Sequence, residues 1–593
     1  MALSAIQILK SGLPYLPSGM LYPRGIGQSY LMALSVWTFG QSEWALRFPS
    51  AVSGSILIII SFFLGRRFLP KDFNIVFVLI IAILPSMIAL SQSARMYIYF
   101  STFATLFALM IFRWEENSTS SNLLASYIVY LISLQFHTLT VFLSPLFFYP
   151  WANKQTRKLF IQGSIGFILA MVSYLLLSHW MKLQYAGTLV SSSSEEYSIF
   201  QSATYLLNAH PVISAFVFII LLFILLYMYH VNYIKEKIFV VSIVLFSLGL
   251  FLITLLQYHI GALFLILAAI IYLRTGGRIR PLILLAVSIL LLFSCQYYLL
   301  EQSGLFPEFR KVMRALNGQS SLWPYIRFSS YFPIGAIIYL LVLIHAAFRL
   351  AKRCNVPHHF LFFLLAVWIP LFLIGFIKWD VLPRYTYGQV TFFILSCIAG
   401  VYTVSKHYGL TMEEKYHRYK YLIYPVLIIA FVNPLDLERN INISYSSFRA
   451  IQNSRGVDHK GAAEYINNIH LDDNDIVIAE DALQQTYYLG HVDYWLRAID
   501  KARKFAKIRN GKPYDLYTGA EIIGTGKALE NVLNNKNRGS VYLITSGETI
   551  HEKEVYLGVD ILDIIKKYNP VIIYRARDQE TLIYHFPKIR MRK

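Results

Sequence analysis

The chain has 593 residues, of which 56% are hydrophobic and only 15% are charged. Soluble domains carry about 25% charged residues, so this composition excludes an ordinary soluble protein and indicates a polytopic membrane protein. The net charge of +20 comes mostly from short Lys and Arg clusters between apolar runs, without the continuous basic stripe of a nucleic-acid-binding protein. We therefore expect no nucleic-acid partner, and attribute the charge to membrane topology and to contacts with anionic membrane lipids.

The first 46 residues carry little charge and are interrupted by Gly and Pro, which predicts a loop with short surface-lying helices. Within it, residues 29–39 form an amphipathic rather than a spanning segment. Apolar runs of about 17 to 25 residues then recur and predict about 13 to 14 transmembrane helices. Their centres are expected near residues 58, 82, 105, 129, 144, 168, 221, 247, 266, 290, 341, 369, 395 and 428, with a single kinked helix as the alternative for 129 and 144.

Lys and Arg cluster in every second loop between these runs, and the positive-inside rule places those loops in the cytoplasm. The remaining loops and the C-terminal region after residue 437 are then expected on the outer side. The expected outer loops are residues 1–46, 91–96 and 179–210, the turn at His259, and residues 299–330 and 378–384.

From about residue 455 the composition becomes that of a soluble domain. Four strands are predicted at residues 475–480, 540–545, 570–574 and 581–586, and three helices near residues 458–468, 526–535 and 557–567. Strands alternating with helices predict an extracytoplasmic α/β domain, which we interpret as a lid or docking module rather than an independent catalytic unit. The domain organisation is thus a first outer loop at 1–46, a membrane region at 47–437 and an α/β domain at 438–593.

Two segments in the outer loops combine arginine with tyrosine: residues 21–25 (LYPRG) and residues 93–97 (SARMY). A guanidinium group pairs bidentately with phosphate oxygens, and a tyrosine ring lies at the level of the lipid headgroups. We therefore predict that Tyr22, Arg24, Arg95 and Tyr97 bind a lipid-linked phosphate or its sugar. For Arg95 the alternative is an interfacial anchor.

Further candidates lie at other expected outer positions. His137 is expected at an outer helix end, where it is a candidate for positioning a sugar or a carboxylate, with a buried structural histidine as the alternative. Arg384 and Tyr385 form a third arginine–tyrosine pair, although an ion pair between Arg384 and Asp380 would explain the arginine equally well. Less specific candidates are His179, Lys182, His210 and His259, together with a basic surface at Arg310, Lys311 and Arg314.

Four motifs follow one another along the chain: residues 8–14 (ILKSGLP), 39–50 (FGQSEWALRFPS), 94–97 (ARMY) and 383–385 (PRY). In this order they resemble the GT-C superfamily of glycosyltransferases, in the branch of family 39 that includes protein O-mannosyltransferases and the lipid A aminoarabinose transferase. The resemblance covers the chain to about residue 405, and the α/β domain resembles the soluble tail of some members.

The resemblance implies a GT-C fold and transfer of a sugar from a polyprenyl-phosphate carrier to a lipid, glycan or protein acceptor on the extracytoplasmic face. It implies that Arg24 and Arg95 bind the carrier phosphate or the donor sugar. No cofactor is certain from it, a divalent metal ion stays open, and no metal ligands are assigned. It favours a bacterial inner membrane, with the endoplasmic reticulum membrane as the alternative.

A transferase of this kind needs a carboxylate to accept the proton of the attacking acceptor. Members of the family carry an acidic pair in the first outer loop after a first membrane helix, and this sequence begins after both. We therefore expect the chain to be N-terminally truncated or to have a misassigned start, with the catalytic carboxylate upstream. Within the sequence Glu43 is the secondary candidate, and a position capping or flanking a helix that begins near residue 47 is its alternative.

Two other classes of function stay open. One is a transporter or flippase of lipid-linked substrates, which the lack of an obvious internal repeat and of an acidic residue midway through a span disfavours. The other is a catalytically inactive scaffold relative, which the missing acidic pair favours.

Overall fold

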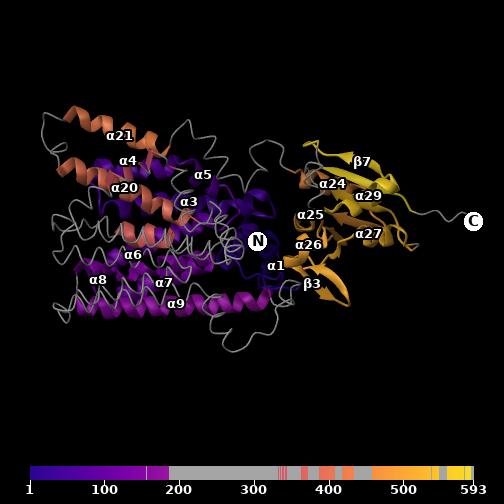
Figure 1. Ribbon diagram of the computed structural model, residues 1–593, viewed down its shortest axis with the longest axis horizontal. Helices are drawn as coiled ribbons and strands as arrows, with labels where there is room; N and C mark the ends of the chain where they lie inside the picture. The colour runs from indigo at the N-terminus through magenta and orange to yellow at the C-terminus, as the bar shows by residue number, and fades with distance from the viewer. Residues whose placement is uncertain are drawn as a thin grey trace, which may run out of the picture.

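The computed structural model describes residues 1–154, 156–185, 332, 334–335, 337–339, 341–342, 362–371, 386–407, 417–432, 457–535, 537–545, 557–579 and 581–588. In these ranges the chain forms a bundle of apolar helices at one end and an α/β domain at the other, with the N-terminal segment between them (Figure 1). The predicted span centres near residues 221, 247, 266 and 290 lie outside the described residues.

Four described helices are long and apolar enough to cross a membrane: α3 (Glu43–Gly65), α6 (Tyr97–Glu116), most of α9 (Arg157–Tyr185) and nearly all of α20 (Tyr387–His407). A fifth apolar segment is bent by 54° between α4 (Lys71–Ile83) and α5 (Pro85–Ser91). The bend lies where Leu84 is extended, because proline disfavours a helical conformation at the residue before it. The chain is therefore a polytopic helical membrane protein with a C-terminal α/β domain, as predicted.

The remaining described elements of this region are shorter. They are α1 (Ala2–Ser11), α2 (Ile26–Phe39), α7 (Ser120–Phe136), the 3₁₀ helix η1 (Thr138–Phe148), α8 (Tyr149–Lys154), the π-helix η3 (Leu364–Trp368) and α21 (His417–Phe431). The region predicted around residues 129 and 144 thus consists of one α-helix followed by a 3₁₀ segment. Pro145 lies inside that segment and cannot donate a backbone hydrogen bond there.

Helix α6 forms the centre of the bundle, and small residues bring its neighbours close to it. Ser53 of α3 and Thr102 of α6 share a hydrogen bond of 3.0 Å. A Cβ atom added to Gly388 of α20 would collide with the ring of Phe100, so only glycine permits this approach. Close contact through small residues is typical of helices packed within membranes.

The first two helices match the prediction of short helices in a glycine- and proline-punctuated loop. Helix α1 ends at Gly12, whose φ of 76° is in the left-handed region that glycine adopts freely. Helix α3, which follows these two, was predicted to begin near residue 47 but begins at Glu43. Ser42 caps it, because its Oγ accepts the N–H of Ala45 at 3.1 Å.

The described residues of the α/β domain form an eight-stranded sheet in the order β3-β4-β5-β2-β1-β6-β8-β7. Its strands are β1 (Ile476–Ala479), β2 (Tyr494–Leu496), β3 (Ala506–Arg509), β4 (Lys512–Asp515), β5 (Glu521–Ile523), β6 (Val541–Thr545), β7 (Val571–Arg575) and β8 (Leu582–Phe586). The four central strands, β5-β2-β1-β6, pair in parallel, and the strands flanking them are antiparallel.

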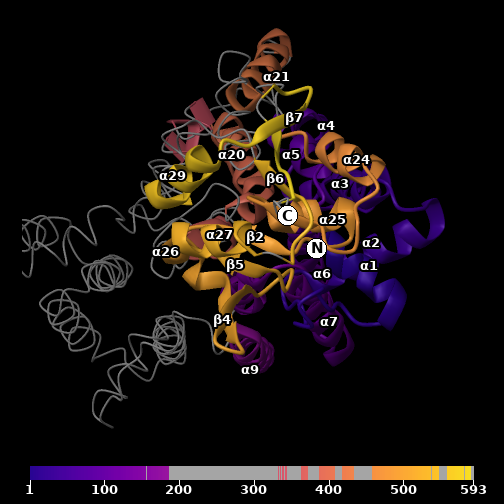
Figure 2. The ribbon, with the colours of Figure 1, turned by 90° about the vertical axis from the view of Figure 1, so that its right-hand side faces the viewer.

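Helices cover both faces of this sheet, as Figure 2 shows end-on. The described helices are α24 (His459–Asn468), α25 (Ala482–Leu489), α26 (Ile499–Ala502), η7 (Arg503–Phe505), α27 (Gly526–Leu533) and α29 (Val559–Tyr568). Alternate residues of β1 point to opposite faces: Ile478 packs with α27 and α29, whereas Val477 and Ala479 pack with α24 and α25.

The α/β domain contacts the N-terminal segment directly, and α25 lies between the sheet and this segment (Figure 1). Ser18 donates its hydroxyl to the backbone oxygen of Leu516 at 2.5 Å and its N–H to that of Tyr517 at 3.3 Å. Tyr487 of α25 packs against the apolar cluster formed by α1, α2 and the start of α3. This contact positions the domain over one end of the helix bundle.

Candidate functional site

A cavity of about 750 Å³ lies at the junction of the helix bundle and the α/β domain. It is surrounded by the N-terminal segment, by the N-terminal ends of α3 and α6, by the C-terminal ends of α7 and α9, and by α25. The two segments that combine arginine with tyrosine therefore meet at the same end of the bundle. At the opposite end, Arg67 forms an ion pair with Glu116.

Arg24 and Arg95 both line this cavity with exposed side chains. Gly25 brings their segments together: it has a φ of +59°, and a Cβ atom added there would lie 3.2 Å from the sulfur of Met96. Arg95 itself lies in a tight turn, in which its N–H donates to the backbone oxygen of Ser93 at 2.8 Å. The glycine after the first arginine thus packs against the methionine after the second, and the cavity wall between them carries two guanidinium groups.

Tyr22 also lines the cavity, at the end of an ordered loop that follows α1. The N–H of Tyr22 donates to the backbone oxygen of Pro14 at 2.8 Å, and Tyr15 pairs with Leu21 in an antiparallel bridge. The Tyr22 ring meets the edge of Tyr517 from the α/β domain, with ring centroids 6.4 Å apart. The loop before Arg24 is therefore held by its own backbone hydrogen bonds and by the contact with the α/β domain.

His137 and Tyr97 lie deeper in the cavity wall, and both side chains are buried. His137 ends α7, and its Nδ1 accepts the N–H of Leu139 at 3.1 Å, which leaves Nε2 to carry the ring proton. Its ring lies between those of Tyr97 and Phe100, at centroid distances of 5.5 and 5.1 Å. Its cap position gives His137 a structural role, and its place in the wall puts its ring beside the cavity.

Glu43 is the only carboxylate among the described residues that line the cavity. Its Oε2 lies 3.1 Å from Arg47, one helical turn further along α3. Its Oε1 accepts the hydroxyl of Tyr488 at 2.9 Å. Burial, followed by the neighbouring Glu43 carboxylate, raises the pKa of the Tyr488 hydroxyl well above its usual value, so the tyrosine stays protonated and donates. Glu43 therefore lies in the first turn of α3, directly after the Ser42 cap, and also faces the cavity.

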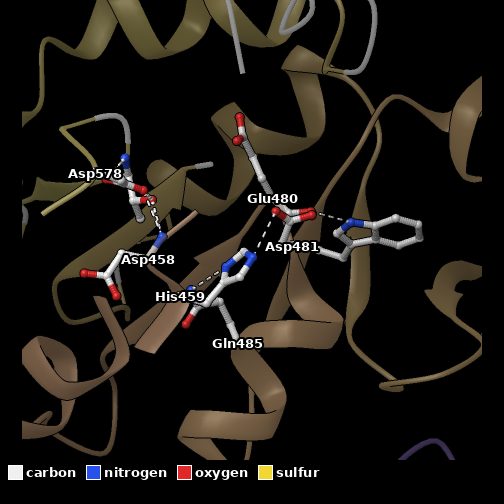
Figure 3. Close-up of polar contacts among 8 residues, drawn as sticks. Asp458, His459, Glu480, Asp481, Gln485 and Asp578 are labelled. Atoms are coloured by element: carbon white, nitrogen blue, oxygen red, sulfur yellow. Dashed lines mark hydrogen bonds and ion pairs between the residues drawn. The ribbon is translucent and has the colours of Figure 1, made fainter. Parts of the chain in front are cut away.

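The α/β domain contributes a second polar group, centred on His459 (Figure 3). His459 Nδ1 lies 3.4 Å from Gln485 Nε2, and its Nε2 lies 3.8 Å from Asp481, which follows the carboxyl end of β1. Burial lowers the pKa of His459, although the carboxylates of Asp481, Asp578 and Asp458 oppose this shift. Asp458 caps α24 by accepting the N–H of Gly461 at 2.8 Å, so much of this group stabilises the domain.

Several predicted residues lie outside the described ranges: Arg384, Tyr385, Asp380, His210, His259, Arg310, Lys311 and Arg314. His179 lies in α9, as does Lys182, whose side chain is also outside what is described. Sequence reasoning missed Tyr487, Tyr488, Tyr517 and His459, which come from the α/β domain and line the cavity. For these residues the sequence offered one indication of a binding surface, which is the adjacent pair of aromatic residues Tyr487 and Tyr488.

Over the parts of the chain that the structure covers, no group of three or more His, Cys, Asp or Glu side chains could hold a metal ion. The cavity itself offers a single carboxylate among its described residues, which does not fit a divalent ion that needs several oxygen ligands. We therefore assign no step to a metal.

No protein-family model matches the sequence, and none of the curated proteins does. Among solved structures, the chain is similar to ArnT from Cupriavidus metallidurans in the apo state, with 12% identity, a TM-score of 0.38, and coverage of 98% of this chain and 92% of that chain. The same protein bound to undecaprenyl phosphate matches at 11% identity with the same coverage and TM-score.

A second similar structure is the Archaeoglobus fulgidus oligosaccharyltransferase tethered with an acceptor peptide. It matches at 12% identity, with a TM-score of 0.44 and coverage of 100% of this chain and 70% of that chain. Both proteins are GT-C glycosyltransferases.

Proposed function

We propose that the chain is a membrane glycosyltransferase that takes a sugar from a polyprenyl-phosphate-linked donor and transfers it to a lipid, glycan or protein acceptor. The observation that carries this proposal is the meeting of Arg24, Arg95 and Glu43 in one cavity at the end of the membrane helices. The reaction needs both cations and a carboxylate there.

Arg24 and Arg95 would bind the phosphate of the donor. Each guanidinium group can form two parallel hydrogen bonds to phosphate oxygens, and its charge persists at any physiological pH. When the bond between the sugar C1 and the phosphate oxygen breaks, negative charge grows on the leaving phosphate. The two arginines stabilise that charge and so lower the barrier to departure of the polyprenyl phosphate.

Two positions were considered for the catalytic carboxylate, one upstream of the sequence and Glu43 within it. The cavity contains Glu43, so the proposal takes this secondary candidate as the group that accepts the proton of the acceptor. The attacking hydroxyl oxygen or amine nitrogen forms the new bond to C1 as its proton passes to Oε1 or Oε2 of Glu43, and the electrons of the old C1–O bond leave with the phosphate. Arg47 and Tyr488 hold the carboxylate in place through contacts of 3.1 and 2.9 Å. Attack from the side opposite the leaving phosphate inverts the configuration at C1.

The proposal places the cavity and the α/β domain on the extracytoplasmic side of a bacterial inner membrane. The alternating Lys and Arg clusters support this orientation, because the ion pair of Arg67 lies at the opposite end of the bundle. A fluorescent maleimide that cannot cross membranes tests it: a single cysteine introduced at the exposed Leu471 should react in intact spheroplasts. A lack of reaction until the membrane is permeabilised would contradict this orientation.

The donor site is tested with radiolabelled undecaprenyl phosphate bound to the full chain in lipid nanodiscs. Replacing either arginine, as Arg24→Gln or Arg95→Gln, removes a charge-assisted contact worth about 1.5 to 3 kcal/mol, so Kd should rise at least about tenfold. Arg113→Gln, in the last turn of α6 at the opposite end of the bundle, is the matched control and should leave Kd unchanged. Equal affinity in all three variants would overturn the phosphate site.

A further inference from the structure

The cavity has two chemically different walls. The α/β domain contributes His459, Leu483, Gln484, Tyr487, Tyr488, Phe505 and Tyr517. None of these lining residues carries a permanent charge, and four of them are aromatic. Burial lowers the pKa of His459, which favours the neutral form of its ring. The arginines of the cavity, Arg24, Arg47 and Arg95, all come from the N-terminal segment and the helix bundle, and Arg47 is paired with Glu43.

Tyr487 and Tyr488 form an ordered aromatic pair on the uncharged wall. Their rings meet edge to face, with centroids 4.9 Å apart and an angle of 82° between the planes. Tyr487 is held by the side chain of Gln41, and Tyr488 donates to Glu43 at 2.9 Å. Gln41 lies just before the Ser42 cap of α3 and Glu43 is the first residue of that helix, so the rings are oriented by the helix bundle as well as by their own helix.

Three classes of acceptor would place different demands on this wall. An anionic acceptor would lie beside Glu43, and the nearby Arg47 is already paired with that carboxylate. A purely apolar acceptor would remove Gln484, His459 and Glu43 from water without offering hydrogen bonds, which is costly. A neutral sugar satisfies both demands, because its C–H faces stack on aromatic rings while its hydroxyls bond to amide, imidazole and carboxylate groups.

We propose that Tyr487 and Tyr488, with Gln484 and His459, form an acceptor subsite for an uncharged sugar ring. This inference rests on the proposed function, because it identifies the acceptor as a glycan rather than a peptide or a simple lipid. A sugar stacked on Tyr488 lies within one hydrogen bond of Glu43, since the two side chains are 2.9 Å apart. The subsite therefore brings an acceptor hydroxyl to the group that would take its proton.

The subsite is tested by the binding of the purified full chain, in detergent micelles, to an array of neutral, amine-bearing and uronic-acid-bearing glycans. We expect retention on neutral glycans, with Tyr487→Ala weakening it at least tenfold and Tyr487→Phe preserving it, because phenylalanine keeps the stacking ring. Tyr568→Ala is the matched control: it changes a half-buried tyrosine of α29, on the opposite face of the sheet, and should bind as the unaltered chain does.

Preference for uronic-acid-bearing or amine-bearing glycans, absence of retention on any glycan, or unchanged retention in Tyr487→Ala would each overturn the subsite. Binding of undecaprenyl phosphate, measured on the same preparations, separates this result from the proposed function. Tyr487→Ala should leave phosphate binding intact, and Arg95→Gln should leave glycan retention intact. Loss of both ligands in both variants would contradict two separate walls.

Discussion

The contact between the α/β domain and the N-terminal segment can be weakened at one glycine. Gly519 has a φ of +81°, and a Cβ atom added there would lie 3.2 Å from the Cα atom of Ser18. Gly511 has a similar φ of +75° but has no atom within 4 Å of such a Cβ, which makes it a matched control. Alanine at either position costs about 1 to 2 kcal/mol for the left-handed backbone. Only Gly519→Ala also places a methyl group against Ser18, at the contact between the α/β domain and the N-terminal segment.

The extra cost at Gly519 can be worked out from the hydrogen bonds that the alanine would displace. Ser18 makes two bonds to the α/β domain, at 2.5 and 3.3 Å, and each contributes about 0.5 to 1.5 kcal/mol. Their loss should weaken docking by about 1 to 3 kcal/mol, or about 5- to 150-fold in the ratio of docked to undocked molecules.

The assay is hydrogen exchange at the amide of Ser18, which donates to Tyr517 when the domain is docked. In Gly519→Ala the exchange rate at Ser18 should increase by the same factor of about 5 to 150, because the amide exchanges from the undocked molecules. In Gly511→Ala the rate should not change. Equal exchange at Ser18 in both variants would show that this contact does not hold the domain in place.

Three further predictions concern stability. The pKa of His459 is lower in the folded state than in the unfolded chain, so the neutral histidine contributes to stability above about pH 6.5. This contribution is lost as the pH falls through the folded-state pKa. His459→Asn should therefore make the exchange protection of the β1 amides less sensitive to acid. Leu543→Ala empties a fully buried position in β6 and should cost about 2 to 5 kcal/mol, read from the exchange of the β6 amides, whereas an unchanged rate would contradict its place in the core. Arg67→Gln removes an ion pair with the half-exposed Glu116 and should lower stability by at most about 1 kcal/mol in thermal unfolding of the full chain; a larger loss would mean that the pair is shielded from water.

The membrane region was largely predictable because a spanning helix has a strong signature in length and apolarity. The predicted centres near residues 58, 105, 168 and 395 each fall within a long described helix. The broken pair α4–α5 was harder to predict, because its apolar run continues through the proline that bends it. Likewise the helix after the first loop begins four residues early, because Ser42 caps it.

In the α/β domain, the four predicted strands and three predicted helices are all present. The four missed strands, β2 to β5, contain only three or four residues each, too few to show an alternating pattern. One signal was available: Asn510 and Gly511 between β3 and β4 both have positive φ, as in a tight hairpin turn, and this residue pair is typical of such turns.

The candidate site was predictable only in part. The arginine–tyrosine segments could be found because each is a local pattern, and the structure places Tyr22, Arg24, Arg95, Tyr97 and His137 around one cavity. The contribution of the α/β domain could not be found in this way. Tyr488 lies 445 residues from Glu43 in the sequence, and only folding brings the two together. A contact of this kind leaves no local pattern in a single sequence.

The most direct test is transfer of radiolabelled sugar from polyprenyl-phosphate donors in membranes that express the full chain. We predict transfer by the unaltered chain and by the Arg113→Gln control. In the Arg24→Gln/Arg95→Gln double variant we predict a loss of about 100-fold or more, since two charge-assisted contacts to the leaving phosphate are removed. Transfer that is equally fast in the double variant, or that never rises above the background of membranes without the chain, would contradict the proposed function.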